Sequence, residues 1–190
     1  MRLMASVFAF VALPCAISAQ TAERTYWVLS LQGDTLCGNV KEAAFKSIVD
    51  TNPPLESARI TYAANKLSEV TYQTNAESGD WIVIDKYTLS DTVTHLRRAI
   101  VFIGQRVEVF QDATIRHGKA SPFRIVKVAP TDPKQPPDTV DLDYPSVTVV
   151  TDLHASPYVE IAEEMRSRSR TRLCRPGKAD SAGSGSEPRR

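Results

Sequence analysis

Two alternating stretches near the start of the chain predict a β-hairpin. In residues 25–31 and 35–41, apolar and polar side chains alternate, as they do in strands with one buried face. Glycine adopts a positive φ without a Cβ clash, so a two-residue type II′ turn is expected at Gly33-Asp34. The register that follows pairs Leu31 with Leu36, Leu29 with Gly38, and Trp27 with Val40 on one apolar face.

The same period of two predicts more strands along the body of the chain. These are residues 57–62, 67–73, 80–87, 99–103, 106–110, 113–116, 122–129 and 146–152. A second hairpin, centred on Gly104-Gln105, is expected to place Phe102 opposite Val107 and Ile100 opposite Val109. Residues 42–50 fit either a short helix or an irregular strand, and residues 88–98 form a polar stretch without a clear period.

A helical period first replaces the strand period at Ser156-Pro157. Serine can cap a helix and proline fits its first turn, so a helix is expected from Ser156 to about Arg172. Its apolar face consists of Tyr158, Ile161, Ala162 and Met165.

These elements predict a mainly β fold. We expect a curled antiparallel sheet or a partly open barrel of seven to nine strands, with one C-terminal helix. The intervening residues 130–145 hold five prolines and four aspartates, which favours an extended, solvated excursion from the sheet.

The first 19 residues have the pattern of a secretory signal peptide. A basic start is followed by an apolar run, and Ile17-Ser18-Ala19 places a small residue at the cleavage point before Gln20. A membrane anchor is the rival interpretation, although the run of about 15 residues is short of the ~20 that a spanning helix needs. A lipoprotein signal ending at Cys15 is a third, disfavoured by Pro14. No later stretch is long and apolar enough to span a bilayer.

The remaining chain predicts one β-rich domain, residues 20–174, and a disordered basic tail, residues 175–190. Residues 20–165 carry 14 Lys/Arg and 20 Asp/Glu, a net charge of −6. Residues 166–190 carry 8 Lys/Arg and 2 Asp/Glu, a net charge of +6. The domain is therefore mildly acidic, while the end of the chain is basic.

Candidate chemistry along the chain is sparse. The three histidines, His95, His117 and His154, lie at no known metal-binding spacing, and Asp138, Asp141 and Asp143 lack the glycine and distal glutamate of an EF-hand loop. Nucleophile-elbow and phosphate-loop patterns are absent from the sequence, so we expect no catalytic residue, metal or cofactor. Cys37 and Cys174 remain after signal removal, and an oxidising compartment would allow them to form a disulfide.

Arginine alternates with hydroxyl side chains in residues 166–172. Export removes nucleic acid as a partner, which leaves an anionic surface or an acidic protein as the candidate partner. The contacts would be made by Arg166, Arg168, Arg170 and Arg172. The alternatives are a solvated helix end, or a tail that folds back on the acidic body.

The segment Gly33-Asp34-Thr35-Leu36, followed by Gly38, resembles the hairpin that follows the signal peptide in many exported proteins of Bacteroidetes-type bacteria. Cys37 stands where an aromatic residue is common in that group. The resemblance covers about a tenth of the chain. It implies a cell-envelope location and a β-rich fold, and it carries over no catalytic or ligand-binding residue.

Together these features predict an exported periplasmic or secreted protein that acts as a non-catalytic binding or structural module of the cell envelope. The alternative is a lipocalin-like carrier of a small apolar ligand, with a cavity lined by Trp27, Trp81, Phe102 and Tyr72. A hydrolase is a weaker alternative, which would need converging titratable groups.

Overall fold

The computed structural model describes residues 23–31, 35–51, 54–132, 134 and 144–176. Several predicted features fall outside these ranges: the signal peptide, the turn at Gly33-Asp34, the acidic residues Asp138, Asp141 and Asp143, and the tail beyond Pro176.

The described chain contains ten strands and two helices. The strands are β1 (Arg24–Leu31), β2 (Thr35–Asn39), β3 (Glu56–Ala63), β4 (Lys66–Asn75), β5 (Trp81–Leu89), β6 (Thr94–Phe102), β7 (Val107–Arg116), β8 (Lys119–Ala120), β9 (Arg124–Pro130) and β10 (Arg172–Pro176). The helices are α1 (Glu42–Thr51) and α2 (Pro157–Ser167). All ten strands belong to one sheet of order β10-β2-β1-β3-β4-β5-β6-β7-β8, with β9 also paired to β7.

The prediction of a mainly β fold with a curled antiparallel sheet is confirmed, and the sheet is not closed into a barrel. Every strand pair in the described chain is antiparallel, and most join successive strands through short connections. The strand count exceeds the predicted range because two strands were not predicted. Strand β8 has only two residues, and β10 lies where the end of the helix and the start of the tail were expected. Residues 42–50, left open between helix and strand, form α1.

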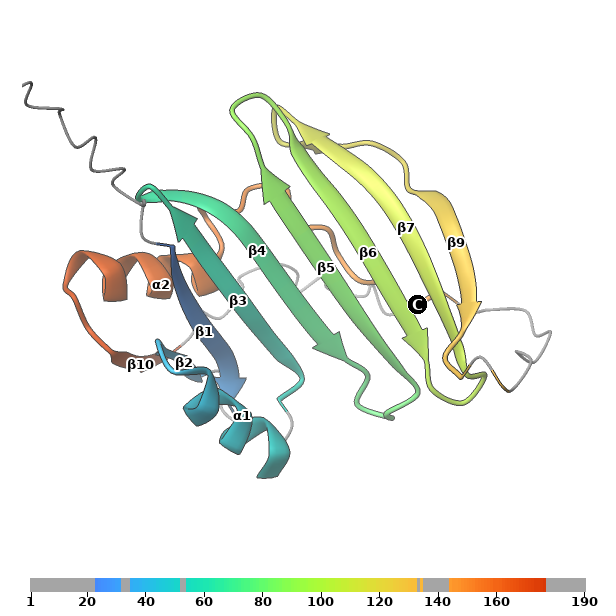
Figure 1. Ribbon diagram of the computed structural model, residues 1–190, viewed down its shortest axis with the longest axis horizontal. Helices are drawn as coiled ribbons and strands as arrows, with labels where there is room; N and C mark the ends of the chain where they lie inside the picture. The colour runs from blue at the N-terminus through green and yellow to red at the C-terminus, as the bar shows by residue number, and fades with distance from the viewer. Residues whose placement is uncertain (1–22, 32–34, 52–53, 133, 135–143, 177–190) are drawn as a thin grey trace, which may run out of the picture.

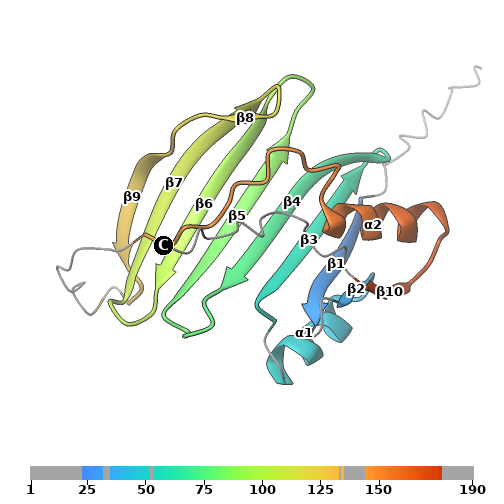
Figure 2. The ribbon, with the colours of Figure 1, turned by 180° about the vertical axis from the view of Figure 1, so that it is seen from behind.

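The two faces of the sheet are covered differently (Figures 1 and 2). Residues 144–156, here called the strap, cross one face in extended form and lead into α2, which lies over β1 and β3 on that same face. We call this the covered face and the other the open face. On the open face α1 packs at the β1–β2 end, where the Phe45 ring lies 5.3 Å from that of Trp27.

The covered face carries the hydrophobic core in two clusters. The larger cluster joins β1, β3 and β4, the C-terminal parts of β5 and β7 and the N-terminal part of β6 to α2. It includes Ile60, Val70, Tyr87, Ile161 and Met165. The smaller consists of Val83, Ile100, Phe102, Val107 and Val109. The apolar face predicted for the helix is confirmed, because Tyr158, Ile161, Ala162 and Met165 are all buried.

The register predicted for the first hairpin is wrong by one residue. Leu31 pairs with Thr35, and Val28, not Leu29, pairs with Gly38. Three residues therefore lie between Leu31 and its partner Thr35, where the predicted register left four residues between Leu31 and Leu36. The shift moves β2 side chains to the opposite faces. As a result Val28 and Leu36 lie together in the core beneath α2.

The second predicted hairpin is confirmed. Phe102 pairs with Val107 and Ile100 with Val109, as the central Gly104-Gln105 indicated. Two neighbouring boundaries are wrong. Strand β6 begins at Thr94, inside the stretch that showed no period, and β7 runs unbroken to Arg116. Pairing on both sides of β6 stabilises its polar first residues as strand.

The strand predicted at residues 146–152 is absent, because this segment is part of the strap. Its apolar residues still point inward: Val147 packs against the smaller cluster, and Val149 and Val150 pack against the larger one. Within the described chain, the strap makes no backbone–backbone hydrogen bond to a strand. The alternating pattern is therefore satisfied by contact with the face of the sheet, not by pairing at its edge.

Helix α2 ends earlier than predicted. Ser169 adopts a left-handed φ of 50°, and the amide of Arg170 donates to the carbonyl of Met165, which closes the helix before Arg172. Ser156 occupies the N-cap position but makes no side-chain capping bond. Its hydroxyl instead accepts a 2.5 Å hydrogen bond from Tyr72.

Candidate functional site

A cavity of about 590 Å³ lies between the strap and the covered face. We call it the strap pocket. The side chains of β3–β5, the strap and the first turn of α2 line it. Figure 2 shows the strap and α2 in front of the sheet on this face. Its chemically distinct lining residues are the aromatics Tyr72, Trp81, Tyr87 and Tyr158 and the carboxylates Glu56, Asp85 and Asp152.

The floor of the strap pocket contains a buried ion pair. Asp85 on β5 faces Arg98 on β6, and the guanidinium donates two hydrogen bonds of 2.7 Å to the carboxylate. Both side chains are almost fully buried, at 5% and 6% exposure. The ring of Phe123 covers the guanidinium at 4.6 Å. The bidentate contact neutralises the charge of Asp85. The pair lies between the two core clusters, with Tyr87 and Leu96 on one side and Val83 and Ile100 on the other.

Three tyrosines form a connected wall. The Tyr72 ring meets Tyr87 and Tyr158 edge to face, with centroids 5.7 and 5.6 Å apart. Each hydroxyl has a partner, as buried tyrosines usually do. Tyr72 donates to Ser156, Tyr158 donates to Glu56 at 2.7 Å, and Tyr87 accepts the amide of Val150 at 3.1 Å. The wall therefore ties sheet, helix and strap together.

Burial raises the pKa of these tyrosines above that of an exposed tyrosine. Burial is the largest cause of the rise in the pKa of Tyr72, to about 12. The charge of Glu56 raises this pKa further, whereas the hydrogen bond with Ser156 lowers it. Burial also raises the pKa of Tyr158 and Tyr87, assisted by the charges of Glu56 and Asp85 respectively. At neutral pH the wall is thus uncharged and lies in a negative field.

A second large cavity, of about 720 Å³, lies on the open face. On β5, β6 and β7 its charged residues lie next to residues that point to the covered face, as alternation along a strand requires. Strand β9 adds the cation of Arg124. The lining includes Lys86, His95, Arg97, Asp112 and Arg124. Arg97 and Asp112 form an exposed ion pair at 3.0 Å. This surface is rich in cations, in contrast to the strap pocket.

The four aromatic residues predicted to line a cavity are divided between different places. Tyr72 and Trp81 line the strap pocket. Trp27 lies on the open face against Phe45, and Phe102 is buried beneath Tyr144 of the strap, with ring centroids 5.9 Å apart. Alternation along the strands explains the division, since Trp27 projects opposite to the buried Tyr26 and Val28.

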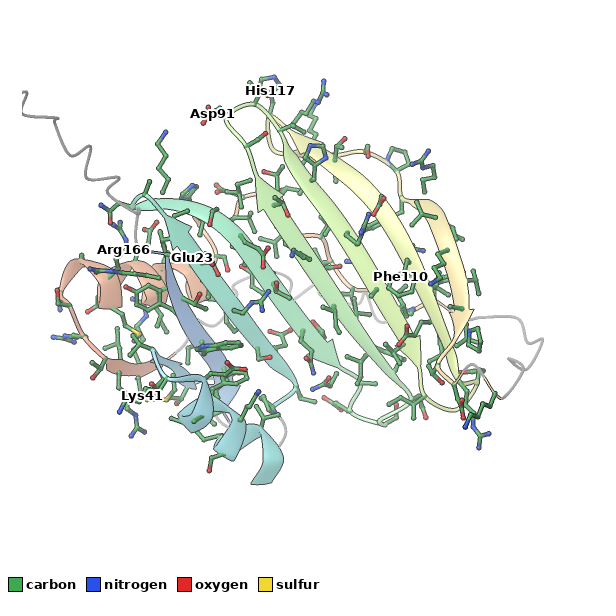
Figure 3. All side chains as sticks on the ribbon, viewed as in Figure 1. Glu23, Lys41, Asp91, Phe110, His117 and Arg166 are labelled. Carbon is green, nitrogen blue, oxygen red and sulfur yellow. A yellow bond between two sulfur atoms is a disulfide. The ribbon has the colours of Figure 1, made fainter. Side chains whose placement is uncertain are left out.

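The arginines predicted to contact an anionic surface lie at the C-terminal end of α2 and beyond it. The guanidinium of Arg166 stacks on the Tyr62 ring at 4.8 Å, and Figure 3 shows it on the side of the molecule that carries α2. Arg168 and Arg170 lie 2.9 and 3.8 Å from Glu164. Arg172 is exposed at the start of β10. Contact of these residues with a surface stays a prediction.

The two cysteines lie opposite each other. Cys37 on β2 and Cys174 on β10 are directly paired in register, and their sulfur atoms form a disulfide with Cα atoms 4.1 Å apart. Strand β10 also takes in Arg175 and Pro176, which the sequence placed in the tail. Arg175 contacts Glu160 at 2.8 Å.

Elsewhere in the described ranges, His, Cys, Asp and Glu side chains nowhere gather in groups of three that could hold a metal ion. His154 lies 3.5 Å from Glu163, and Figure 3 shows His117 near Asp91 at one end of the sheet. Neither described helix is long and apolar enough to cross a membrane.

Sequence reasoning missed Glu56, Asp85 and Asp152 as residues of a common site, together with Tyr87 and Tyr158. One signal was present: Asp85 interrupts the apolar strand of residues 81–84, and a charge within a buried strand needs a partner. Arg98 is that partner at a matched position of the next strand. The strap residues gave no such signal, because their pattern is that of an ordinary strand.

Comparisons of the chain with protein-family models, with curated proteins and with solved structures gave no match.

Proposed function

We propose that this protein is a non-catalytic binding module that holds a small amphipathic ligand in the strap pocket. The observation that carries the proposal is the pocket itself, a cavity of about 590 Å³ whose lining combines aromatic and apolar side chains with polar ones. Ligand pockets of small molecules typically have ≈ 300–1,000 Å³ and this kind of lining. The small-ligand alternative is thus favoured over a purely structural role.

The lining argues for binding over catalysis. Its tyrosines stay protonated, and Asp85 is held in a bidentate ion pair with Arg98. The Ser156 hydroxyl receives a hydrogen bond from Tyr72, a neutral phenol that cannot act as its base. A nucleophile activated by a neighbouring base is therefore not formed by the described lining.

The strap offers a route for a ligand to enter. It is attached to the sheet through side chains such as Val147 and Val149 and through the amide of Val150 on the Tyr87 hydroxyl. A segment held in this way can separate from the sheet without breaking a ladder of backbone hydrogen bonds. Access to the pocket then needs only a local rearrangement.

An exported location is part of the proposal. The pattern of residues 1–19 supports it, since a basic start, an apolar run and a small residue at the cleavage point are typical of secretory signals. The disulfide between Cys37 and Cys174 supports it independently, because such bonds persist in oxidising compartments.

The proposal is tested with the neutral dye N-phenyl-1-naphthylamine, which fluoresces in apolar sites. The wild-type protein is expected to bind the dye saturably with a 1:1 stoichiometry. Thr74→Phe fills the strap pocket and is expected to weaken dye binding at least tenfold. The matched control Thr88→Phe places the same side chain on the open face and is expected to leave dye binding unchanged. Absence of saturable binding, or equal loss in both variants, would refute the proposal.

A further inference from the structure

We infer that the ligand of the strap pocket is an organic cation, a positively charged nitrogen carried on an apolar or aromatic body. The inference rests on the proposed function and specifies its ligand class. It combines three properties of the pocket, namely its charge, its aromatic walls and its contrast with the cavity on the opposite face.

The strap pocket has an uncompensated negative charge. Three carboxylates line it, and among the described residues its lining includes neither lysine nor arginine nor histidine. Arg98 neutralises Asp85 from below, which leaves Glu56 and Asp152. Glu56 accepts only a neutral hydrogen bond from Tyr158 there, and Asp152 accepts the amide of Ala155 at 3.3 Å. Both carboxylates are exposed, so a ligand in this pocket meets two negative charges at its solvent-facing side.

This charge reaches the aromatic wall. The pKa of Tyr158 and of Tyr72 is raised first by burial and then by the charge of Glu56, so the carboxylate field extends over both rings. The potential within the pocket favours a cation over an anion or a neutral ligand of the same shape.

The wall also suits a cation sterically and electronically. The faces of aromatic rings carry negative charge density, and they attract ammonium groups within about 6 Å. Tyr72, Tyr87 and Tyr158 meet edge to face, so their ring planes are nearly perpendicular, at 86° and 80°. These rings, with Trp81 farther along β5, line the pocket and offer aromatic surface to such a group.

The cavity on the open face provides a contrast within the same molecule. It is of similar size but is lined by Lys86, Arg97 and Arg124, of which Lys86 is paired with Glu69 at 2.7 Å and Arg97 with Asp112 at 3.0 Å. Arg124 on the open face and Glu56 and Asp152 in the strap pocket therefore give the two cavities opposite charge. An anionic ligand would find the open face more favourable, and a cationic ligand would find the strap pocket more favourable.

The inference is tested with two probes of nearly the same shape. Benzyltrimethylammonium carries a quaternary nitrogen where neopentylbenzene carries a quaternary carbon. Each is titrated as a competitor against bound N-phenyl-1-naphthylamine at physiological ionic strength. The cation is expected to displace the dye at a concentration at least tenfold lower than the neutral compound.

A matched pair of charge variants locates the effect. Glu56→Gln with Asp152→Asn removes the two uncompensated carboxylates and is expected to reduce the preference for the cation to less than threefold. Glu77→Gln with Asp91→Asn removes two exposed carboxylates outside the pocket lining and is expected to preserve the preference. Equal displacement by both probes, or equal loss in both double variants, would overturn the inference while the proposed function stands. Failure of the dye to bind would overturn both.

Discussion

Asp85 and Arg98 face each other on neighbouring strands with two hydrogen bonds of 2.7 Å, in a position that divides the hydrophobic core of the covered face. On the open face of the same sheet, Arg97 and Asp112 form the corresponding exposed pair at 3.0 Å. The two pairs have the same chemistry and lie one residue apart along β6. Their energetic roles differ because burial removes the solvent that screens an unpaired charge.

We predict that Asp85→Ala lowers the free energy of unfolding by about 3–5 kcal/mol, since it leaves the buried guanidinium of Arg98 without a partner. Replacing both residues by Leu and Met is expected to recover most of this loss, because apolar side chains of similar volume need no partner. Urea unfolding followed by circular dichroism measures both. Asp112→Ala is the exposed control, with little change expected, and an equal loss in Asp85→Ala and Asp112→Ala would contradict the argument.

This pair also shows how far the sequence could lead. The period of two identified β5 as a strand, and it identified the hairpin of β6 and β7 with its register, because Phe102 and Ile100 match Val107 and Val109 across Gly104-Gln105. It could not identify Arg98 as the partner of Asp85. The residues before Ala99 showed no period, so the start of β6 and the residues it presents to β5 were hidden.

The first hairpin failed for a different reason. A glycine followed by an aspartate fits loops of two or three residues, and both registers give one face that is mostly apolar. The structure selects the register in which Gly38 faces α2. The choice therefore depends on a helix more than a hundred residues away, which local patterning cannot include. The strap was missed for the same reason, since only the finished sheet shows which surface it crosses.

Gly38 provides the second prediction. A Cβ atom at this position would meet the sulfur of Met165, and would lie 2.8 Å from Cγ2 of Ile161. Gly38→Ala is therefore expected to destabilise the protein by about 1–3 kcal/mol through overpacking between β2 and α2. Gly104→Ala is the control, because nothing lies within 4 Å of its Cβ and its φ is not in the left-handed region. Thermal unfolding distinguishes the two, and equal melting temperatures would show that α2 is not seated as described.

The buried tyrosines provide a pH-dependent prediction. The pKa of Tyr72 is raised by burial to about 12 in the folded state, whereas tyrosine in an unfolded chain ionises near pH ~10. The unfolded state therefore loses protons first, so stability is intact below pH ~10 and declines as the pH rises toward 12. Tyr62, Tyr87 and Tyr158, whose pKa values burial also raises, act in the same direction.

The urea midpoint between pH 8 and pH 12 measures this decline, and absorbance at 295 nm reports tyrosinate in the folded protein. Tyr72→Phe should make the decline above pH ~10 shallower, whatever it does to the stability at neutral pH. Tyr144→Phe, an exposed strap residue, serves as the control. A folded protein whose tyrosines all ionise near pH ~10 would contradict the burial of the wall.

The disulfide between Cys37 and Cys174 provides the last prediction. It fastens the edge strand β10 to β2 and closes a loop of 137 residues. In the chain-entropy model a loop of this length stabilises the folded state by about 5 kcal/mol, by restricting the unfolded chain. A reductant should therefore lower the urea midpoint of the wild type markedly. The variant with both cysteines replaced by serine should start from the lower midpoint and show no response to the reductant. Protein isolated from its native compartment and denatured without reductant is expected to contain no free thiol at these positions. Two reactive thiols in that protein, or an unchanged midpoint on reduction, would show that β10 is held to β2 by its backbone pairing alone.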